Sequence, residues 1–359
     1  MPPTRPRNIL LIKPSALGDV ALALPALCSL RASFPEAKIT WLVRPEFAGL
    51  LERVQALDEI LPFDRRFLGK WWCQPRPAAA LWRLLSTLRQ RRFDLVIDLQ
   101  GLFRTAFFAR VTGCRQRYGP STARELATLF YAHRVDPHPD STHVIDEHLR
   151  IVQAAGADAL RAEYGLAATA EDRKAAGRLL AEAGLEKKPY AVLVTGSAHA
   201  LKCWPVEHFA QLADRLSRRF DMAIVGIGTQ AERAAVDRLA ALAEVPVVNL
   251  AGRTGLGALV AVLAGAHLVV SNDTGPGHIA VALDRPTVLI VGPTNPARIC
   301  PYKHRDAVAA VNPFGRGRTI NDYNPVYRIG RVSVEMVLDA IQRRLGEPTQ
   351  DSDTPFGGP

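Results

Sequence analysis

Short apolar segments alternate with longer amphipathic ones along most of the chain. In the first half, strand-like runs begin at Asn8 (NILLIK), Ile39 (ITWLV) and Asp94 (DLVIDL). In the second half they begin at Tyr190 (YAVLV), Met222 (MAIVG), Val245 (VPVVNL), His267 (HLVVS) and Thr287 (TVLIV). Runs of this kind are typical of strands buried on both faces of a parallel sheet. The pattern predicts an α/β protein.

Helical periodicity fills the intervals between these runs. Helices are predicted at about 19–32, 78–91, 103–112 and 143–155, then at 205–219, 230–243, 255–265, 275–283 and 333–345. Alternating strands and helices predict Rossmann-like units with parallel sheets. Because the alternation restarts at Tyr190, we expect two such units in tandem.

Chain length supports the same division, since 359 residues exceed what one hydrophobic core usually sustains. Residues 157–189 contain a predicted helix and end in the charged stretch Glu186-Lys187-Lys188-Pro189, which suits an interdomain link. The expected domains are 1–185 and 186–346. The Pro-, Gly-, Asp- and Thr-rich residues 347–359 are expected to be disordered.

Targeting and metal-binding signals are not visible in the sequence. No apolar run approaches 18 residues and no signal-peptide core precedes the first strand, so we expect a cytoplasmic protein. The five cysteines form no C-x-x-C pair and no Cys/His cluster at metal-ligand spacing. They are interpreted as reduced thiols, and no metal site is expected.

Basic residues are concentrated in one part of the chain. Of the net charge of +10, the segment from Arg65 to Arg134 contributes 14 basic against 3 acidic residues, an excess of 14 − 3 = +11. Such a segment attracts an anionic partner, which leaves nucleic acid, a phosphorylated glycolipid and an acidic membrane surface open. No zinc motif or aromatic RNA-binding signature accompanies it, which disfavours nucleic acid.

The first strand leads into K-P-S-A-L-G-D-V (Lys13 to Val20), which ends where a helix begins. Ligands of open α/β sheets bind at the carboxyl ends of strands, so Asp19 is expected to face the crevice. It could serve as an ordinary helix cap or as a general base toward a substrate hydroxyl. The stretch alone favours the cap.

A second turn, S-N-D-T-G-P-G-H (Ser271 to His278), joins an apolar strand to a helix. Its small residues leave backbone N–H groups free to approach a phosphate at a helix N-terminus. A carboxylate repels a diphosphate, so Asp273 is expected to bond backbone amides or sugar hydroxyls. A tight turn without a ligand is equally consistent with this stretch.

A third strand end, T-G-S-A-H-A-L-K-C-W-P (Thr195 to Pro205), places Lys202 in a polar loop. Its ammonium could neutralise a departing diphosphate, although a loop lysine is usually only a solvated charge. A rival signal, G-I-G-T-Q-A (Gly226 to Ala231), matches the dinucleotide fingerprint but follows the second strand of its unit, and the next strand ends without the required acid. Glu232 could instead bond a ribose there.

Together these turns, with the helix start G-x-x-x-x-E-R, resemble the lipopolysaccharide heptosyltransferase family, glycosyltransferase family 9, over residues 8 to about 345. The stretches Asp94 to Ala106 and Thr122 to Tyr131 resemble its heptosyltransferase I branch. The resemblance implies a GT-B fold, with two Rossmann-like domains facing each other across a cleft. It also implies metal-independent, inverting transfer of heptose from ADP-heptose to the Kdo/lipid A core, with peripheral contact at the inner face of the inner membrane.

The resemblance also implies roles for single residues, with the acceptor held by the N-terminal domain and the donor by the C-terminal one. Asp19 resembles the general base, which reverses the preference for a simple cap, and Lys202 resembles the residue that counters the leaving diphosphate. The implied donor-binding residues are Thr195, Ser197, Glu232, Asp273, Thr274, Gly275 and His278. The implied acceptor-binding residues are Lys13, Arg65, Arg66 and Arg124, with Arg65 and Arg66 in an expected loop.

Two stretches depart from the family pattern. Thr195-Gly196-Ser197 replaces a more usual pair of hydroxyl residues, and W-W-C-Q-P-R-P (Trp71 to Pro77) replaces a more basic loop. Another nucleotide sugar, a later core acceptor and a non-catalytic sugar-nucleotide binder are the alternatives. The presence of both Asp19 and Lys202 favours an enzyme, since a binder needs no base.

Overall fold

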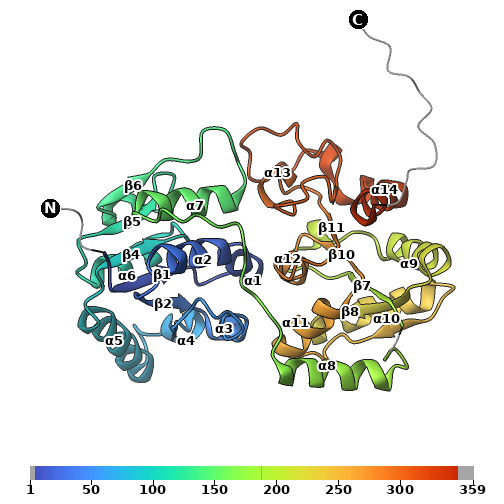
Figure 1. The fold of residues 1–359 in the computed structure, drawn as a ribbon, viewed down its shortest axis with the longest axis horizontal. Coiled ribbons are helices and arrows are strands. Elements are labelled where there is room, and N and C mark those ends of the chain that lie inside the picture. Colours follow the sequence, from blue (N-terminus) through green and yellow to red (C-terminus); the bar gives the residue numbers. More distant parts are fainter. Residues whose placement is uncertain (1–4, 187, 347–359) are drawn as a thin grey trace, which may run out of the picture. The chain divides into compact units, whose positions relative to one another are not determined.

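The computed structural model describes residues 5–186 and 188–346, and their contacts divide the chain between Asp172 and Arg173 into two compact units. Each unit contains one sheet covered by helices (Figure 1). The division falls inside α8 (Ala170–Glu182), ahead of the expected boundary at residue 185. The later part of α8 groups with the C-terminal unit, where Glu182 pairs with Arg253. Lys187 and the predicted disordered tail lie outside the described residues.

Within the described residues, the N-terminal unit is built on a parallel six-stranded sheet. Its strands are β1 (Asn8–Ile12), β2 (Lys38–Val43), β3 (Glu59–Pro62), β4 (Leu95–Asp98), β5 (Arg117–Pro120) and β6 (His133–Val135). They lie in the order β3-β2-β1-β4-β5-β6. The central strand β1 pairs in register with β2 (Ile9 with Ile39) and with β4 (Ile9 with Leu95).

Helices cover both faces of this sheet. They are α1 (Leu17–Ala21), α2 (Leu24–Ser33), α3 (Pro45–Leu51), α4 (Arg65–Leu68), α5 (Pro75–Gln90), α6 (Phe103–Val111), α7 (Val144–Ala154) and the 3-10 turn η1 (Ala127–Phe130). Helix α2 packs beside α7, and α5 packs beside α6 over a separate core that includes Leu84, Leu88 and Phe108.

The C-terminal unit repeats this plan. Its strands are β7 (Tyr190–Val194), β8 (Ala223–Ile227), β9 (Val247–Asn249), β10 (Leu268–Asn272), β11 (Thr287–Ile290) and β12 (Val308–Ala309), in the order β12-β11-β10-β7-β8-β9. All pairings between these strands are parallel.

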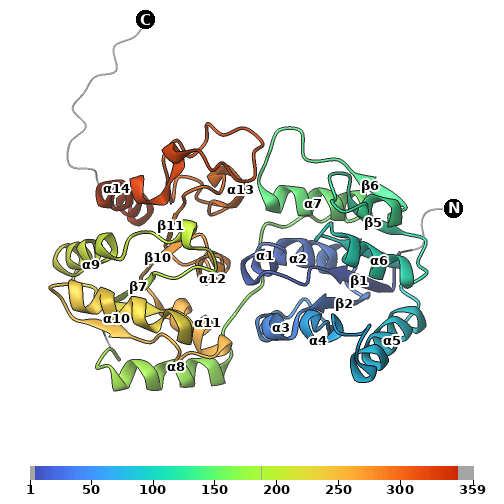
Figure 2. The same cartoon turned by 180° about the vertical axis from the view of Figure 1, so that it is seen from behind.

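The helices of this unit are α9 (Val206–Phe220), α10 (Arg233–Leu242), α11 (Leu256–Gly265), α12 (Gly275–Ala282), α13 (Pro296–Ile299) and α14 (Val334–Leu345). Short 3-10 turns are η2 (Ala200–Lys202), η3 (Gln230–Glu232), η4 (Pro325–Tyr327) and η5 (Ile329–Arg331). Helices α9, α10 and α14 share one apolar core, whereas α11 and α12 pack against each other (Figure 2).

Two helix predictions need correction. The expected helix at 19–32 is broken into α1 and α2, because Pro25 lacks the N–H that a helix interior requires and is accommodated in the first turn of a new helix. The expected loop at Arg65 and Arg66 is the short helix α4. The Asp64 carboxylate caps it by accepting hydrogen bonds from the Arg66 and Phe67 N–H groups, both at 3.0 Å.

In each sheet the chain adds strands first to one side of the central strand and then to the other. This switch point lies between β1 and β4 in one unit and between β7 and β10 in the other. Strand order reverses there, so the following loops run to opposite sides and leave room for a ligand at the carboxyl ends of the two strands. The predicted turns after β1, β7 and β10 are therefore placed at the two switch points.

Candidate active site

The switch point of the C-terminal unit unites two of the predicted turns. Thr195 follows β7, Asp273 follows β10, and these strands are hydrogen-bonded neighbours. Asn272, fully buried at the end of β10, fixes the turns. Its Nδ2 donates to the Thr195 carbonyl at 2.8 Å, and its Oδ1 accepts from the Trp204 N–H at 3.1 Å.

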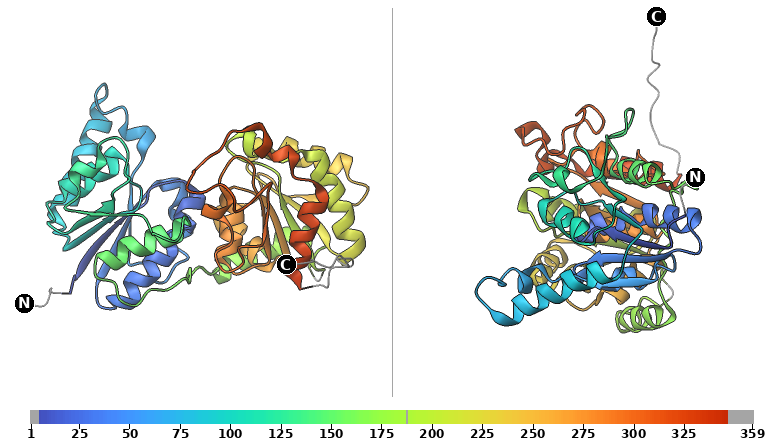
Figure 3. Two further views of the ribbon diagram at one scale, coloured as in Figure 1. Left: turned by 90° about the horizontal axis from the view of Figure 1, so that it is seen from above. Right: turned by 90° about the vertical axis from the view of Figure 1, so that its left-hand side faces the viewer.

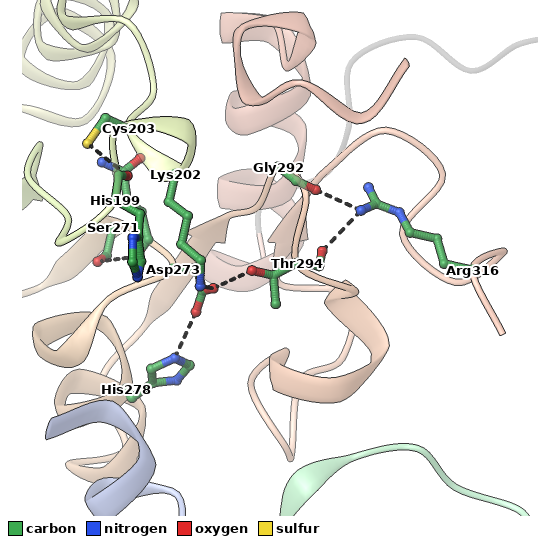
Figure 4. A network of polar contacts seen from close by, with 10 residues as sticks. His199, Lys202, Cys203, Ser271, Asp273, His278, Gly292, Thr294 and Arg316 are labelled. Carbon is green, nitrogen blue, oxygen red and sulfur yellow. Dashed lines mark hydrogen bonds and ion pairs between the residues drawn. The ribbon is translucent and has the colours of Figure 1, made fainter. Parts of the chain in front are cut away.

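The Asp273 carboxylate is the centre of a side-chain network (Figure 4). The Lys202 Nζ, reaching in from η2, donates to Asp273 Oδ2 at 2.6 Å, and the Thr294 hydroxyl donates to the same oxygen at 2.8 Å. His278 Nε2, on α12, lies 3.2 Å from Asp273 Oδ1. These contacts correct one expectation, because side chains rather than backbone amides satisfy this carboxylate.

The network keeps Asp273 ionised. Burial alone would raise its pKa, but the hydrogen bond and charge of His278 and the charge and hydrogen bond of Lys202 outweigh burial and hold the pKa well below its ordinary value. Lys202 is about a quarter exposed, whereas Asp273 is buried. The ammonium therefore lies between a buried carboxylate and the surface.

Two buried polar atoms beside this network have no hydrogen-bond partner among the described residues: Thr195 Oγ1 and His278 Nδ1. Buried polar groups are nearly always satisfied in folded proteins, so orphaned ones indicate a place for a ligand. Thr274 is the N-cap of α12 and Gly275 its first residue, and the Thr274 side chain makes no capping bond. Pro276 has no N–H, and the Gly277 and His278 N–H groups donate to the Thr274 carbonyl at 3.1 and 3.4 Å, so within the described residues the Thr274 and Gly275 N–H groups are the ones left open to a ligand at this helix start.

Glu232 lies after the neighbouring strand β8, and Ser197 lies in the turn after β7. The Glu232 Oε2 atom accepts hydrogen bonds from the Thr229 N–H at 2.6 Å and from the Thr229 hydroxyl at 2.9 Å, which leaves Oε1 without a bond within the described residues. A Cβ added at Gly196 would lie 1.9 Å from that Oε1 atom. The glycine thus lets Glu232 pack against the Thr195–Ser197 turn, and the structure brings the two predicted donor stretches together.

Arg316 supports this site and has no counterpart among the sequence predictions. Its Nη1 donates to the Gly292 carbonyl at 2.7 Å and to the Thr294 carbonyl at 3.0 Å. The guanidinium carbon lies 3.9 Å from the Tyr327 ring centroid. A buried arginine that bonds only carbonyls carries no local sequence signal, because its partners are backbone atoms of a distant loop.

The switch point of the N-terminal unit is differently built. Lys13 is only 6% exposed, and its Nζ donates to the Leu99 carbonyl at 3.1 Å without a carboxylate partner among the described residues. Asp98, at the end of β4, accepts hydrogen bonds from the Tyr131 hydroxyl at 2.7 Å and from the Gln100 N–H at 2.8 Å. Burial raises the pKa of Asp98 above its ordinary value in spite of these bonds.

Asp19 lies in the first turn of α1 and is partly exposed. Its Oδ2 atom accepts a hydrogen bond from the Ala16 N–H at 2.9 Å, and Oδ1 makes none within the described residues. The side chain thus reaches back to the cap residue rather than being the cap itself. One carboxylate oxygen stays available to a substrate.

The predicted acceptor arginines lie on neighbouring elements of the same unit. Arg65 and Arg66 are on α4. Arg124 lies in the loop after β5, and its N–H donates to the Gly101 carbonyl at 2.9 Å. Arg104, which the sequence predictions missed, connects these groups. Burial and the nearby charge of Arg65 lower its pKa, and Glu125 partly offsets them. The structure thus brings Arg65 near Arg104, but within the described residues it shows no contact of Arg65 or Arg66 with Arg124.

The described part of the chain has neither a metal-binding cluster nor a membrane-spanning helix. Residues 5–186 and 188–346 contain no group of three His, Cys, Asp or Glu side chains that could hold a metal ion. In the same residues no helix is long and apolar enough to span a membrane. Within the described residues none of the five cysteines forms a disulfide; Cys73 is exposed, and Cys114 and Cys300 are buried.

Two Rossmann-like units, one with a buried carboxylate–ammonium network at its switch point, are the architecture of a glycosyltransferase of GT-B type. The sequence model of glycosyltransferase family 9 (heptosyltransferase) matches residues 81–321, more than half of the chain. The chain therefore belongs to glycosyltransferase family 9, and it is an enzyme of that class. The match contains all donor-side residues and Arg124, whereas Lys13, Asp19, Arg65 and Arg66 precede it.

Individual relatives of the chain also bear the names of heptosyltransferases. The chain is 35% identical to lipopolysaccharide heptosyltransferase 1 of Pseudomonas aeruginosa over 275 residues, which covers 74% of this chain and 73% of the relative. It is 30% identical to the Escherichia coli K12 enzyme of the same name, covering 74% and 82%. An Escherichia coli heptosyltransferase solved with ADP-2-deoxy-2-fluoro heptose has the same fold, with a TM-score of 0.70, 26% identity and coverage of 94% and 99%.

Proposed function

We propose that this protein transfers heptose from ADP-heptose to the Kdo/lipid A inner core of lipopolysaccharide, with inversion at the sugar and without a metal ion. The observation that carries the proposal is the Lys202–Asp273 pair at the β7/β10 switch point, beside the N-terminus of α12. Asp273 holds the Lys202 ammonium, about a quarter exposed, where it can donate a hydrogen bond to a departing nucleotide diphosphate. The curated relatives are named as lipopolysaccharide heptosyltransferases, which supports both substrates.

Donor binding is assigned to the C-terminal unit. The free N–H groups at Thr274 and Gly275 suit a diphosphate, and the orphaned Thr195 Oγ1 and His278 Nδ1 atoms suit additional donor oxygens or hydroxyls. The unused Glu232 Oε1 atom suits the ribose hydroxyls. Ser197, in the turn beside Glu232, extends the same surface.

The reaction would be a single displacement. The Asp19 Oδ1 atom removes the proton from the attacking acceptor hydroxyl, whose oxygen forms the new bond to the anomeric carbon of heptose. The bond from that carbon to the β-phosphate oxygen breaks, and ADP leaves with the electron pair. Because attack and departure occur on opposite faces, the configuration inverts. Lys202 and the α12 N–H groups stabilise the charge that develops on the diphosphate.

Acceptor binding is assigned to the N-terminal unit. Lys13 is a buried cation without an acidic partner among the described residues, and Arg65, Arg66 and Arg124 are exposed cations on elements around it. The acceptor carries phosphates and carboxylates, so these cations complement it. We place the enzyme in the cytoplasm, in peripheral contact with the inner membrane, because its acceptor is anchored to lipid.

The decisive experiment is mass spectrometry of the product formed by the purified protein from deacylated Kdo-lipid A and a small panel of nucleotide sugars. We expect a mass increase of one heptose with ADP-heptose and no product with other donors. We also expect full turnover in excess EDTA, since Lys202 and α12 supply the charge that a cation would provide. Preference for another donor, or activity that requires added magnesium, would overturn the corresponding part of the proposal.

A further inference from the structure

The segment from Arg65 to Phe93, which includes α4 and α5, presents an unusual surface on the N-terminal unit. Three of the five tryptophans of the chain occur here. Trp71 is 54% exposed, Trp72 76% and Trp82 70%, whereas Trp41 and Trp204 are buried. Phe67 is also exposed. Large aromatic side chains are normally buried, so such a concentration marks a surface that contacts something.

The charge of the same segment is entirely of one sign. Residues 65–93 contain eight basic and no acidic residues: Arg65, Arg66, Lys70, Arg76, Arg83, Arg89, Arg91 and Arg92. On α5 the positions that contact the core are Pro77, Leu84 and Leu88, and Trp82, Arg76 and Arg83 are exposed on its other sides. The aromatic rings are therefore interspersed with cations rather than surrounded by neutral polar groups.

The surface stands at the periphery of its unit. The α4–α5 segment, light blue, projects from the rest of its unit (Figure 3), while Leu84 and Leu88 of α5 anchor it to the core of the sheet. It also continues toward the proposed acceptor residues, because Arg65 is close enough to influence Arg104 on α6, and α6 packs against η1, where Leu129 is exposed.

We infer that the exposed aromatic and basic side chains of residues 65–93 form a membrane-binding surface that inserts the Trp71 and Trp72 indoles into the headgroup region of an anionic bilayer. Tryptophan prefers this region because its ring is apolar while its N–H still requires a polar partner. Arginine and lysine around the rings would meet the anionic headgroups. The inference deepens the proposed function by naming the surface that makes its membrane contact.

A second copy of this chain fits the surface less well. Arg91 is half-buried and paired with Glu59, and the other seven basic residues are exposed. Two such surfaces placed face to face would therefore oppose fourteen exposed basic residues (2 × 7) with no acidic residue from either segment, which like-charge repulsion disfavours. An anionic bilayer has the opposite charge, and it is also where a lipid-linked acceptor would be located. Both the charge and the neighbouring acceptor residues therefore favour lipid.

The test is flotation of the purified protein with two kinds of vesicle, phosphatidylcholine alone and equal parts phosphatidylcholine and phosphatidylglycerol. We expect binding to the anionic vesicles only, weakened by high salt, and quenching of tryptophan fluorescence by brominated lipid. The Trp71→Ser/Trp72→Ser variant should bind on the order of tenfold more weakly. The control variant Leu160→Ser/Leu242→Ser, which alters exposed apolar residues elsewhere, should bind like the wild type.

Equal vesicle binding by the tryptophan variant and the wild type would overturn the inference. So would a wild-type dimer that the tryptophan substitutions dissociate, because the surface would then serve a second copy. An assay of heptose transfer distinguishes a role of the two tryptophans in membrane binding from a role in binding the acceptor. The tryptophan variant should lose turnover on vesicle-borne acceptor and keep it on deacylated acceptor, and loss on both would assign the residues to the acceptor site instead. If the wild type transfers no heptose at all, the proposed function fails while flotation still decides on the surface.

Discussion

The two sheets share one strand order, yet the polar side chains at their switch points are arranged in opposite ways. In the C-terminal unit, Asp273 is held by Lys202, His278 and Thr294, so charge is balanced before any ligand arrives. In the N-terminal unit, Lys13 has no acidic partner within the described residues, and the nearby Asp98 is directed to Tyr131.

This difference shows how one fold can serve two kinds of ligand. A pre-balanced network stabilises a particular charge distribution and costs little reorganisation during reaction, which suits the step in which a diphosphate departs. An unbalanced buried cation gains most when an anion arrives, which suits binding of an acidic acceptor. Strand order determines where the ligands bind, and the side chains at the strand ends determine which ligands these are.

Replacing the proposed base should have the largest effect. Asp19→Asn keeps an oxygen that can accept from the Ala16 N–H, so the fold of α1 should persist while kcat falls by about a hundredfold to ten-thousandfold. Turnover by mass spectrometry and circular dichroism would measure both. The exposed Asp158→Asn variant is the control, and wild-type turnover in Asp19→Asn would refute the assigned role.

Removing the cation of the C-terminal network should have the next largest effect. Lys202→Met should lower kcat by about a hundredfold to a thousandfold, because charge stabilisation at the leaving diphosphate is lost. Steady-state kinetics with saturating acceptor would measure this loss, and Lys188→Met, at an exposed lysine of the same unit, should be neutral. A rise in donor KM alone would mean that Lys202 only binds the ground state.

Removing two acceptor arginines should have a smaller effect. Arg65→Ala/Arg66→Ala should raise the acceptor KM on the order of tenfold with kcat nearly unchanged, and added salt should produce the same rise in the wild type by screening. The matched pair Arg343→Ala/Arg344→Ala on α14 should leave the acceptor KM unchanged. An unaltered acceptor KM in the first variant would show that the two α4 arginines are only solvated surface charges.

Asp98 and Asp273 are the carboxyl groups at the two switch points, and their contributions to stability should change with pH in opposite directions. These are the smallest of the predicted effects. The pKa of Asp98 is raised in the folded protein, so the folded state binds more protons than the unfolded state above about pH 4, and the stability contribution of Asp98 falls as pH rises. The pKa of Asp273 is lowered, so its contribution is complete above about pH 4 and is lost only as pH falls further.

Thermal denaturation at several pH values checks this contrast. As the pH falls from about 7 to about 4.5, the melting temperature of the wild type should rise relative to that of Asp98→Asn. The rise should be about 2–4 °C for each kcal/mol of change in the free energy of unfolding. Over the same range the difference between the wild type and Asp273→Asn should stay constant. If the melting temperatures of both variants, measured relative to the wild type, changed with pH in the same way, the two carboxyls would not differ in their contribution to stability.

The sequence predicted the architecture well because buried parallel strands are continuous apolar runs. All eight predicted strand runs correspond to observed strands. Four strands were missed. Three of them, β3, β6 and β12, lie at sheet edges and are short, and β6 is largely exposed. The fourth, β5, pairs with β4 and β6 but contains Gly119 and Pro120, so it lacks the apolar pattern of a buried strand. Helix α4 was missed because four residues are too few for a helical period.

The candidate site was only partly predictable. Glycine-containing turns after apolar strands singled out Asp19, Lys202 and Asp273 individually as candidates, and the family resemblance supplied their expected roles. The pairing of Lys202 with Asp273 depends on strand order across 71 residues, and Arg316 bonds backbone carbonyls of a distant loop. Contacts of that kind follow from the folded topology and leave no mark in the nearby sequence.

The central claim is that the C-terminal unit binds the donor and the N-terminal unit binds the acceptor. Calorimetric titration of ADP-2-deoxy-2-fluoro heptose, without acceptor, into the wild type, Arg65→Ala/Arg66→Ala and Glu232→Gln tests it most directly. The account predicts equal donor affinity for the first two proteins and about tenfold weaker binding by Glu232→Gln, which loses a charged hydrogen-bond acceptor. Weaker donor binding by the arginine variant, together with unchanged binding by Glu232→Gln, would contradict the account.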